Sequence, residues 1–426
     1  MSYPTTAVPG RIVVISASVG AGHDGAAAEL ARRLTAAGAT VDRHDFLDLL
    51  PARLGSLICG GYHQLLTYAP WAYQRIYAAT EHDGDTGRLT RAILRHAESR
   101  TLRVLPPDTR AVVSTYPLAS QVLGALRRSG RLPVPVLTYL TDFSVHPMWV
   151  ADGVDTHLAA HSVPAAQARA AGAERVTATG PVVNPRFGPA TAAERDAARA
   201  RFGLPQRAPL ALLVAGSWGV GPVEQVATEI RDSGAAVPVV VCGRNQALAD
   251  RLRALGIEHA FGWVEDMPGL MHASDVLVQN AGGLTSLEAF ASGLPVASYG
   301  CIPGHGRTNA AALDEAGLAV WIHSRDDLKP VLGELLEGRL GKAQRAAALA
   351  LFHADPVAGP VAEILGAAAT TAPEAGNAPP PLRRPAVRRT AIVLAAALAT
   401  TMLAGPETTE AAVARGGFHL LHDLGR

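Results

Sequence analysis

The sequence has little cysteine and almost no net charge. Only three cysteines occur among 426 residues, Cys59, Cys242 and Cys301, and no two of them form a CxxC pair. This usage argues against a disulfide framework or a zinc ribbon and favours reduced cytosolic thiols. Lys and Arg number 38 against 37 Asp and Glu, a formal net charge of +1. That balance excludes a globally basic nucleic-acid binder, so no nucleic-acid partner is expected.

Long apolar runs are also scarce. The N-terminal stretch MSYPTTAVPG has no basic n-region and no signal-peptide core. The single candidate anchor is AIVLAAALATTMLAG, residues 391–405, which follows a proline-rich linker and a basic RRPAVRR segment. A membrane-spanning helix needs about 20 apolar residues, so this run is too short to span. Two interpretations stay open here, a C-terminal membrane anchor and a flexible tail.

What the chain does contain is apolar strands in alternation with alanine-rich helical segments. Near-continuous apolar strands joined by helices indicate parallel sheets covered on both faces, the doubly wound α/β class. The clearest apolar runs begin at Ile12, Ala111, Pro135, Leu210, Val237 and Asp275.

A glycine-containing loop follows a strand twice, once early in the chain and again after Leu210. We therefore predict two Rossmann-like domains, consistent with about 150 residues per domain. The predicted divisions are an N-terminal extension (1–10), a first domain (11–183), a hinge (184–205), a second domain (206–366) and a tail (367–426).

The first glycine loop resembles a dinucleotide-binding fingerprint. Gly20, Gly22 and Gly25 satisfy GxGxxG, and Asp42 or Asp45 lies where a ribose-binding acid would be expected. An NAD-dependent oxidoreductase is thus one interpretation. A P-loop is excluded because no Lys-Ser or Lys-Thr pair follows the glycines.

His23 lies between the second and third glycines, where a helix is expected to begin. The positive end of a helix dipole favours a neutral imidazole, which can act as a base. The alternative is a structural histidine that only hydrogen-bonds its own loop.

Two glycine loops of the second domain suit a diphosphate. Gly216 and Ser217 follow one buried strand, so their backbone N–H groups can approach a phosphate. Gly282 and Gly283 follow another strand at a helix start. In the same stretch Thr285 offers a hydroxyl, and Glu288 can hold two ribose hydroxyls. A plain tight turn with a surface acid is the alternative for this stretch by itself.

These motifs, in this order, resemble a family of glycolipid glycosyltransferases. The family includes monogalactosyldiacylglycerol synthases and processive diacylglycerol glucosyltransferases, with the peptidoglycan lipid-II glycosyltransferase as a more distant relative. The stretches that carry the resemblance are SVGAGHDGAA, LTDFSVHPMWVADGVD, VTATGPVVNPRF, VVVCGRNQALADRL, FGWVEDMPGLMHASDV and NAGGLTSLEAFASGLPV.

The resemblance implies a GT-B fold, in which two Rossmann-like domains face each other across a cleft. The second domain would hold a UDP-sugar as donor substrate, with no metal and no further cofactor, and the first would hold the acceptor. By position, it assigns Gly216, Ser217, Gly282, Gly283 and Thr285 to the diphosphate, Glu288 to the ribose, Trp263 and Val264 to the uracil, and Gly243 and Asn245 to the same cleft.

It further implies an inverting transfer in which His23 deprotonates or orients the acceptor hydroxyl, with Asp142 assisting. One departure concerns the sugar. Relatives carry an amide and acid pair after the ribose site, whereas this chain has His305 and Gly306. His305 is the remaining candidate there, and the hexose stays undetermined.

An aromatic segment and a basic helix face predict contact with an anionic membrane surface. Residues 62–77 hold five aromatic side chains, which suit a lipid interface, and arginines follow at helical spacing. The predicted acceptor and membrane residues are Tyr68, Trp71, Tyr73, Arg88, Arg91 and Arg95. A buried aromatic cluster and an ordinary solvated arginine face are the alternatives.

The combined expectation is a cytoplasmic glycosyltransferase, peripheral on the membrane, that moves a hexose from a UDP-sugar to a lipid such as diacylglycerol. Three other functions remain open at this point: a transferase with a soluble acceptor or a nucleotide-sugar epimerase, a catalytically silent donor sensor, and the NAD-dependent oxidoreductase.

Overall fold

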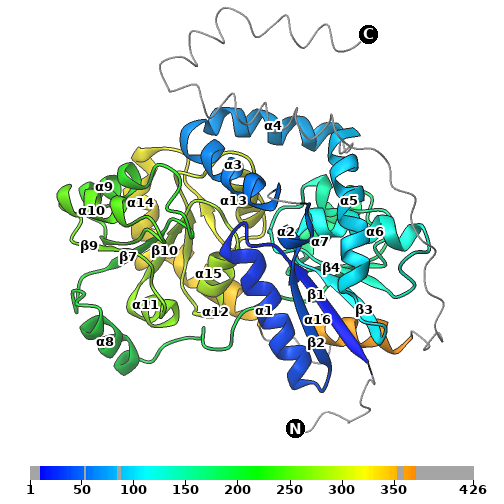
Figure 1. Ribbon diagram of the computed structural model, residues 1–426. Coiled ribbons are helices and arrows are strands. Elements are labelled where there is room, and N and C mark those ends of the chain that lie inside the picture. Colours follow the sequence, from blue (N-terminus) through cyan, green and yellow to red (C-terminus); the bar gives the residue numbers. More distant parts are fainter. Residues whose placement is uncertain (1–9, 52–53, 84–87, 353–358, 371–426) are drawn as a thin grey trace, which may run out of the picture.

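The computed structural model describes residues 10–51, 54–83, 88–352 and 359–370. Two parallel sheets lie side by side in this part of the chain, each covered by helices (Figure 1). This arrangement confirms the predicted doubly wound α/β class. The candidate anchor at 391–405 lies outside the described residues. None of the described helices combines the length and the hydropathy that a bilayer crossing requires.

Within the described residues, the first sheet has six strands in the order β2-β1-β3-β4-β5-β6. They are β1 (Arg11–Ser16), β2 (Thr40–Asp45), β3 (Thr109–Ser114), β4 (Val136–Tyr139), β5 (Thr156–Ala159) and β6 (Val176–Ala178). Around them lie α1 (Ala21–Ala36), α2 (Phe46–Leu49), α3 (Leu54–Tyr68), α4 (Pro70–Asp83), α5 (Arg88–Val104), α6 (Pro117–Arg128), the short 3-10 helix η1 (Pro147–Trp149) and α7 (Ser162–Ala170).

Strand β1 is apolar throughout because both of its faces are covered. Val13 and Ile15 belong to one buried cluster, whereas Ile12 and Val14 belong to another. Successive side chains of a strand point to opposite faces, so one continuous apolar run serves two cores.

The second sheet has six strands in the part of the chain described, in the order β12-β11-β10-β7-β8-β9. They are β7 (Leu210–Val214), β8 (Val237–Val241), β9 (His259–Phe261), β10 (Val276–Gln279), β11 (Val296–Ser298) and β12 (Val320–Trp321). The accompanying helices are α8 (Ala192–Arg201), α9 (Val223–Ser233), α10 (Gln246–Ala254), α11 (Met267–Ala273), α12 (Leu284–Ala291), α13 (His305–Glu315), α14 (Arg325–Leu336) and α15 (Arg339–Ala350).

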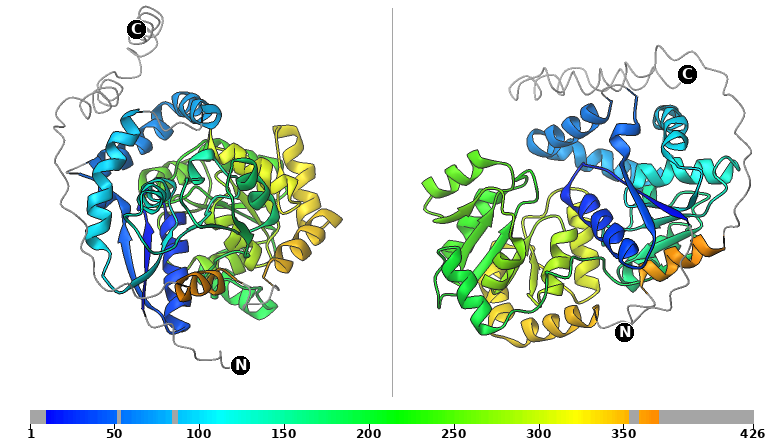
Figure 2. Two further views of the ribbon diagram at one scale, coloured as in Figure 1. Left: turned by 90° about the vertical axis from the view of Figure 1, so that its right-hand side faces the viewer. Right: turned by 60° about the horizontal axis from the view of Figure 1, so that its bottom comes forward.

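The last described helix, α16 (Pro360–Ala369), returns to the first sheet. Ile364 and Ala368 are buried in the same cluster as Ile12 and Val14. Figure 2 shows α16, in orange, against the blue and cyan half of the molecule. The boundary predicted at residue 366 therefore cuts through a helix that packs on the first domain.

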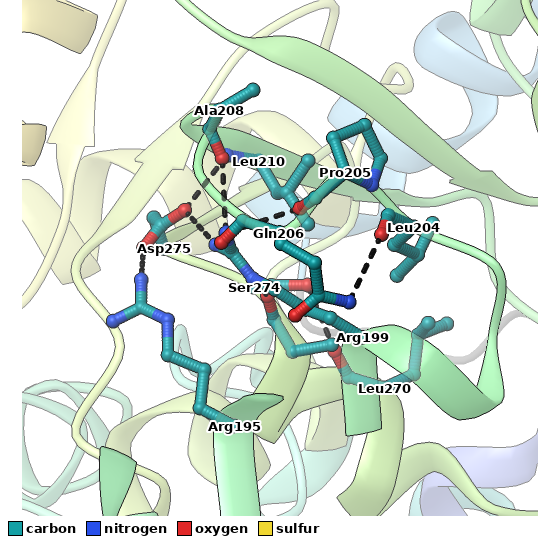
Figure 3. A network of polar contacts seen from close by, with 11 residues as sticks. Arg195, Arg199, Leu204, Pro205, Gln206, Ala208, Leu210, Leu270, Ser274 and Asp275 are labelled. Atoms are coloured by element: carbon teal, nitrogen blue, oxygen red, sulfur yellow. Dashed lines mark hydrogen bonds and ion pairs between the residues drawn. The ribbon is translucent and has the colours of Figure 1, made fainter. Parts of the chain in front are cut away.

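The predicted hinge contains α8, and this helix is fixed to the second sheet. Arg199 is 3% exposed, and its guanidinium donates to Asp275 at 2.7 Å. Arg195 pairs with the same carboxylate, and the backbone N–H of Leu210 donates to it at 2.8 Å. Figure 3 shows these groups converging on Asp275 at the start of β7 and β10. The hinge of 184–205 is thus partly a rigid element of the second domain.

Candidate active site between the two sheets

The two domains meet where helices begin at the carboxyl ends of strands. A Cβ atom placed on Gly25 of α1 would lie 2.4 Å from Cδ2 of Leu284 at the start of α12. One placed on Gly22 would lie 3.8 Å from Cβ of Leu284. The glycines of the first loop therefore allow two helix N-termini from different domains to approach closely.

This contact gives the GxGxxG pattern a purpose other than dinucleotide binding. The two acids that a ribose would need are also engaged. Both carboxylate oxygens of Asp42 accept from Arg11 at 2.9 Å, and Asp45 caps α2 by accepting from the Leu47 N–H at 2.8 Å. The geometry argues against the NAD interpretation.

His23 occupies the N-terminal turn of α1 with its ring fixed. Its Nδ1 lies 2.8 Å from the carbonyl oxygen of Thr115 and 2.9 Å from Oγ1 of Thr141. A carbonyl oxygen only accepts, so this contact assigns the proton to Nδ1 and leaves Nε2 as the basic nitrogen. The ring also packs edge-on against Tyr116, with centroids 5.2 Å apart.

The neighbouring Asp24 holds the loop that carries His23. One of its oxygens accepts from the hydroxyl of Ser16 at 2.6 Å and the other from that of Ser18 at 2.9 Å. The acidic side chain also suits the first turn of a helix. These bonds fix the chain between β1 and α1.

Asp142 lies on the same side of the interface as His23. Its Oδ2 accepts from Nε1 of Trp149 at 3.1 Å. No hydrogen bond joins Asp142 to His23 within the described residues. Its charge instead acts on His305 of the second domain, where it opposes the lowering of the pKa of that histidine by burial.

The loop before α12 leaves the start of that helix open. Gly283 is its N-cap and supplies no side-chain cap. Gly282 has φ +73°, and a Cβ there would lie 2.6 Å from Cβ of Asn309, so only glycine fits. The orphan N–H groups of the first turn, beside the half-buried Thr285, are available to an anion.

The second glycine loop packs against the chain that follows β8. A Cβ on Gly243 would lie 2.5 Å from the carbonyl oxygens of both Gly216 and Ser217. Gly216 itself is exposed, and nothing lies within 4 Å of where its Cβ would be. Asn245 caps α10 by accepting from the Leu248 N–H at 3.0 Å, so its carboxamide oxygen has a structural role.

Glu288 stands one turn into α12, and its carboxylate makes no hydrogen bond within the described residues. Burial raises the pKa of Glu288 to about 8. Glu288 is half-buried. A partly desolvated acid without a partner in this position is expected to gain one from a ligand that donates hydrogen bonds.

The predicted uracil site is more open. Trp263 is 53% exposed, and the guanidinium of Arg244 lies over its ring, 5.1 Å from the centroid. Val264 is half-buried and packs against the core of the second domain. Sequence reasoning did not identify Arg244.

The aromatic segment divides between two faces. Tyr68 and Trp71 are 75% and 53% exposed, as predicted for a surface contact. Tyr73, which was assigned to the same surface, points instead to the second domain: its hydroxyl lies 3.1 Å from Nδ1 of His305. Its assignment to the membrane surface is therefore wrong.

Tyr73 belongs to a pair of consecutive helices, α3 and α4, called the hairpin from here on. The hairpin makes further contacts with the loop around His305. The hydroxyl of Tyr62 lies 3.5 Å from Nδ1 of His305, and that of Tyr77 lies 3.2 Å from Oγ1 of Thr308. The backbone N–H of Gly304 donates to Oε1 of Gln74 at 2.6 Å. None of these cross-domain partners was predicted from the sequence.

Two further contacts join the two domains. The backbone N–H of Ser144 donates to Oδ1 of Asn309 at 2.7 Å, and Trp218 packs against Tyr62 with ring centroids 5.8 Å apart.

The predicted basic helix face is described only in part. Arg95 is exposed, and the side chains of Arg88 and Arg91 lie outside the described ones.

Known proteins resemble this chain in sequence. Residues 23–183 match the family model of monogalactosyldiacylglycerol (MGDG) synthase. A processive diacylglycerol beta-glucosyltransferase of Bacillus pumilus (strain SAFR-032) is 28% identical over 238 residues, which cover 53% of this chain and 60% of that protein. A protein of the same description from Bacillus cereus (strain G9842) is 30% identical over 234 residues, covering 53% and 58%. The chain thus spans about 60% of the length of these relatives.

Solved structures resemble almost the whole described fold. The crystal structure of Medicago truncatula UGT71G1 complexed with UDP-glucose superposes with a TM-score of 0.56 at 12% identity, covering 86% of this chain and all of that one. MurG of Acinetobacter baumannii gives 0.51 at 17% identity, covering 84% and 99%. The predicted GT-B fold is confirmed, as is the resemblance to glycolipid glycosyltransferases.

Proposed function

We propose that the protein is a glycosyltransferase that moves a hexose from a UDP-sugar to the hydroxyl of a membrane lipid such as diacylglycerol. One observation carries the proposal. His23 of the first domain, whose Nε2 has no hydrogen-bond partner among the described residues, lies near helix N-termini of the second domain that no side chain caps there. A base and an anion site thus stand on opposite sides of one interface.

The donor would be held by the second domain. The first turn of α12, the Gly216–Ser217 loop and Thr285 would bind the diphosphate, because backbone N–H groups and the helix dipole favour anions. Glu288 would accept from the ribose hydroxyls. The uracil would lie beside Val264 and the exposed Trp263, whose ring already contacts the guanidinium of Arg244.

The acceptor would be activated from the first domain. Nε2 of His23 takes the proton of the acceptor hydroxyl as its oxygen attacks the anomeric carbon on the face opposite UDP. The new carbon–oxygen bond forms as the bond to the UDP oxygen breaks, so the configuration at that carbon inverts. Preorganised N–H groups stabilise the charge that develops on UDP. We therefore propose a reaction that needs no metal ion, and activity should survive EDTA.

A lipid acceptor is favoured by the exposed hairpin. Of the six large apolar side chains exposed among the described residues, four lie on α3 or α4: Leu57, Tyr68, Trp71 and Ile76. Apolar and aromatic groups clustered on one surface suit a membrane interface. The descriptions of the family model and of the Bacillus relatives also name lipid glycosylation. We place the protein peripherally, on the cytoplasmic face.

The test is incubation of the full chain with UDP-glucose or UDP-galactose and vesicles that contain diacylglycerol, followed by mass spectrometry of the lipids. A lipid heavier by one hexose, with stoichiometric UDP release, is expected. Transfer of the hexose to an added soluble acceptor alone, with release of UDP to solution, would favour a transferase with a soluble acceptor. UDP-hexose binding without any turnover would favour the donor-sensing alternative, and failure to bind UDP would overturn the proposal altogether.

A further inference from the structure

His305 begins α13 in the second domain, yet first-domain side chains hold its ring. Nδ1 lies 3.1 Å from the hydroxyl of Tyr73 on α4 and 3.5 Å from that of Tyr62 on α3. Tyr73 also packs edge-on against the imidazole, with centroids 6.1 Å apart. One residue of the second domain is therefore oriented by the hairpin of the first.

These contacts determine which ring nitrogen of His305 carries the proton. Burial raises the pKa of both Tyr62 and Tyr73, so each phenol keeps its proton. Burial lowers the pKa of His305, which favours the neutral imidazole. Nδ1 then accepts from Tyr73, and the proton of the ring sits on Nε2. Within the described residues Nε2 has no hydrogen-bond partner, so it is a donor ready for a ligand.

The position of His305 indicates which part of the donor it would meet. His23 and Asp142 of the first domain are its electrostatic neighbours. If UDP lies at the start of α12 and the base is His23, the hexose must lie between them, beside His305. The neighbouring residue adds no polar group, because a Cβ on Gly306 would lie 2.6 Å from the carbonyl oxygen of Asn280.

We infer that Tyr73, assisted by Tyr62, is a positioning residue that presents the Nε2–H of His305 to a hydroxyl of the donor hexose. This inference rests on the proposed function and deepens it. Selectivity for the sugar then depends on the acceptor-side hairpin as well as on the nucleotide-binding domain. An exposed tyrosine of the same hairpin, Tyr68, has no such role.

The test compares UDP with UDP-hexoses, because UDP lacks the group that His305 would touch. Calorimetry measures Kd for UDP, UDP-glucose and UDP-galactose with the wild-type protein and with Tyr73→Phe, which keeps the ring and removes the hydroxyl. We expect UDP-hexose binding to weaken about threefold to tenfold, the loss of one hydrogen bond, while UDP binding stays within twofold. The control, Tyr68→Phe, should leave both unchanged.

A double-mutant cycle shows whether Tyr73 acts through His305. In a His305→Ala background, Tyr73→Phe should cause no further loss of UDP-hexose affinity. Equal weakening of UDP and UDP-hexose in Tyr73→Phe, or no change in either, would overturn the inference and leave the proposed function intact. A wild-type protein that does not bind UDP would overturn the proposed function itself.

Discussion

Nδ1 of His23 lies 2.8 Å from the carbonyl oxygen of Thr115, and this pair fixes the tautomer that a general base needs. General acid–base groups contribute about 10²- to 10⁴-fold to a rate. We expect His23→Ala to lower turnover of the UDP-hexose by at least about 100-fold. The Kd for UDP should stay within about twofold, because the proposed nucleotide contacts lie in the other domain. Rates and calorimetry on the same preparation check this.

A substitution next to His23 tests whether the Thr115 carbonyl is enough to hold the imidazole in the tautomer of a base. Thr141→Val removes the second group near Nδ1 but keeps the Thr115 carbonyl, so its effect on turnover should be under about tenfold. Wild-type turnover in His23→Ala with UDP binding intact would show that another group takes the proton.

Glu288 is expected to give the proposed donor site a pH dependence. Its pKa is raised to about 8 by burial, so the free protein holds this acid mostly protonated at pH 7. If ribose hydroxyls donate to the carboxylate, UDP binding favours the ionised form. We then expect the Kd for UDP to fall as pH rises from 6 to 9, with proton release on binding near pH 7. Calorimetry in buffers of different ionisation enthalpy measures both.

The same residue has the opposite effect on stability. A pKa raised above the unfolded value of 4.5 means that the folded state holds the proton more tightly, so stability falls as pH rises from about 4.5 to 8. Glu288→Gln should remove this decline, bringing a gain on the order of 1–3 kcal/mol in the free energy of unfolding at pH 9. It should also remove the pH dependence of UDP binding. An unchanged pH profile in this variant would exclude Glu288 from the nucleotide site.

The apolar runs in the sequence correspond to six inner strands, β1, β3, β4, β7, β8 and β10, and they miss the edge strands and the short inner strands β5 and β11. Central strands such as β1 and β7 are covered on both faces and are therefore apolar throughout. The edge strand β2 reads TVDRHD and is partly exposed along its length, so an apolar-run criterion cannot find it. Strand β12 has only two residues. The predicted boundary at residue 366 divided α16 between the second domain and the tail, because the apolar pattern of this helix does not indicate which sheet it covers.

At the site, local motifs predicted the glycine loops and His23, but not the contacts between domains. The partner of Tyr73 is 232 residues away, and no local pattern encodes that pairing. One signal was present. Tyr73 and Tyr77 are four residues apart and share a helix face, whereas Trp71 falls on nearly the opposite face. Helical spacing alone could have separated the inward tyrosines from the outward tryptophan.

The ion pairs and hydrogen bonds around Asp275 are expected to stabilise the second domain without taking part in the proposed reaction. Asp275→Asn removes the charge that neutralises Arg199, a guanidinium only 3% exposed. Breaking a buried pair costs about 3–5 kcal/mol because one charge stays buried without a counter-ion. Urea unfolding should show a loss of this order. Asp152→Asn, which breaks an exposed pair with Arg128, should cost less than about 1 kcal/mol. Similar losses for both would show that the network is not a structural anchor.

The exposed face of the hairpin supplies the last prediction. Trp71→Ala removes a ring that is 53% exposed, so we expect only a small effect on folding. If α3 and α4 rest on a lipid surface, the affinity for vesicles measured by co-sedimentation should fall at least about tenfold, since a buried aromatic side chain contributes about 1.5–3 kcal/mol. Leu255→Ala, at an exposed apolar position that caps the C-terminus of α10 in the second domain, should change nothing. Arg95→Gln should weaken binding to anionic vesicles more than to neutral ones. If Trp71→Ala sediments with vesicles as the wild type does, α3 and α4 are not the membrane contact. If the wild type binds anionic and neutral vesicles equally, the contact has no electrostatic component.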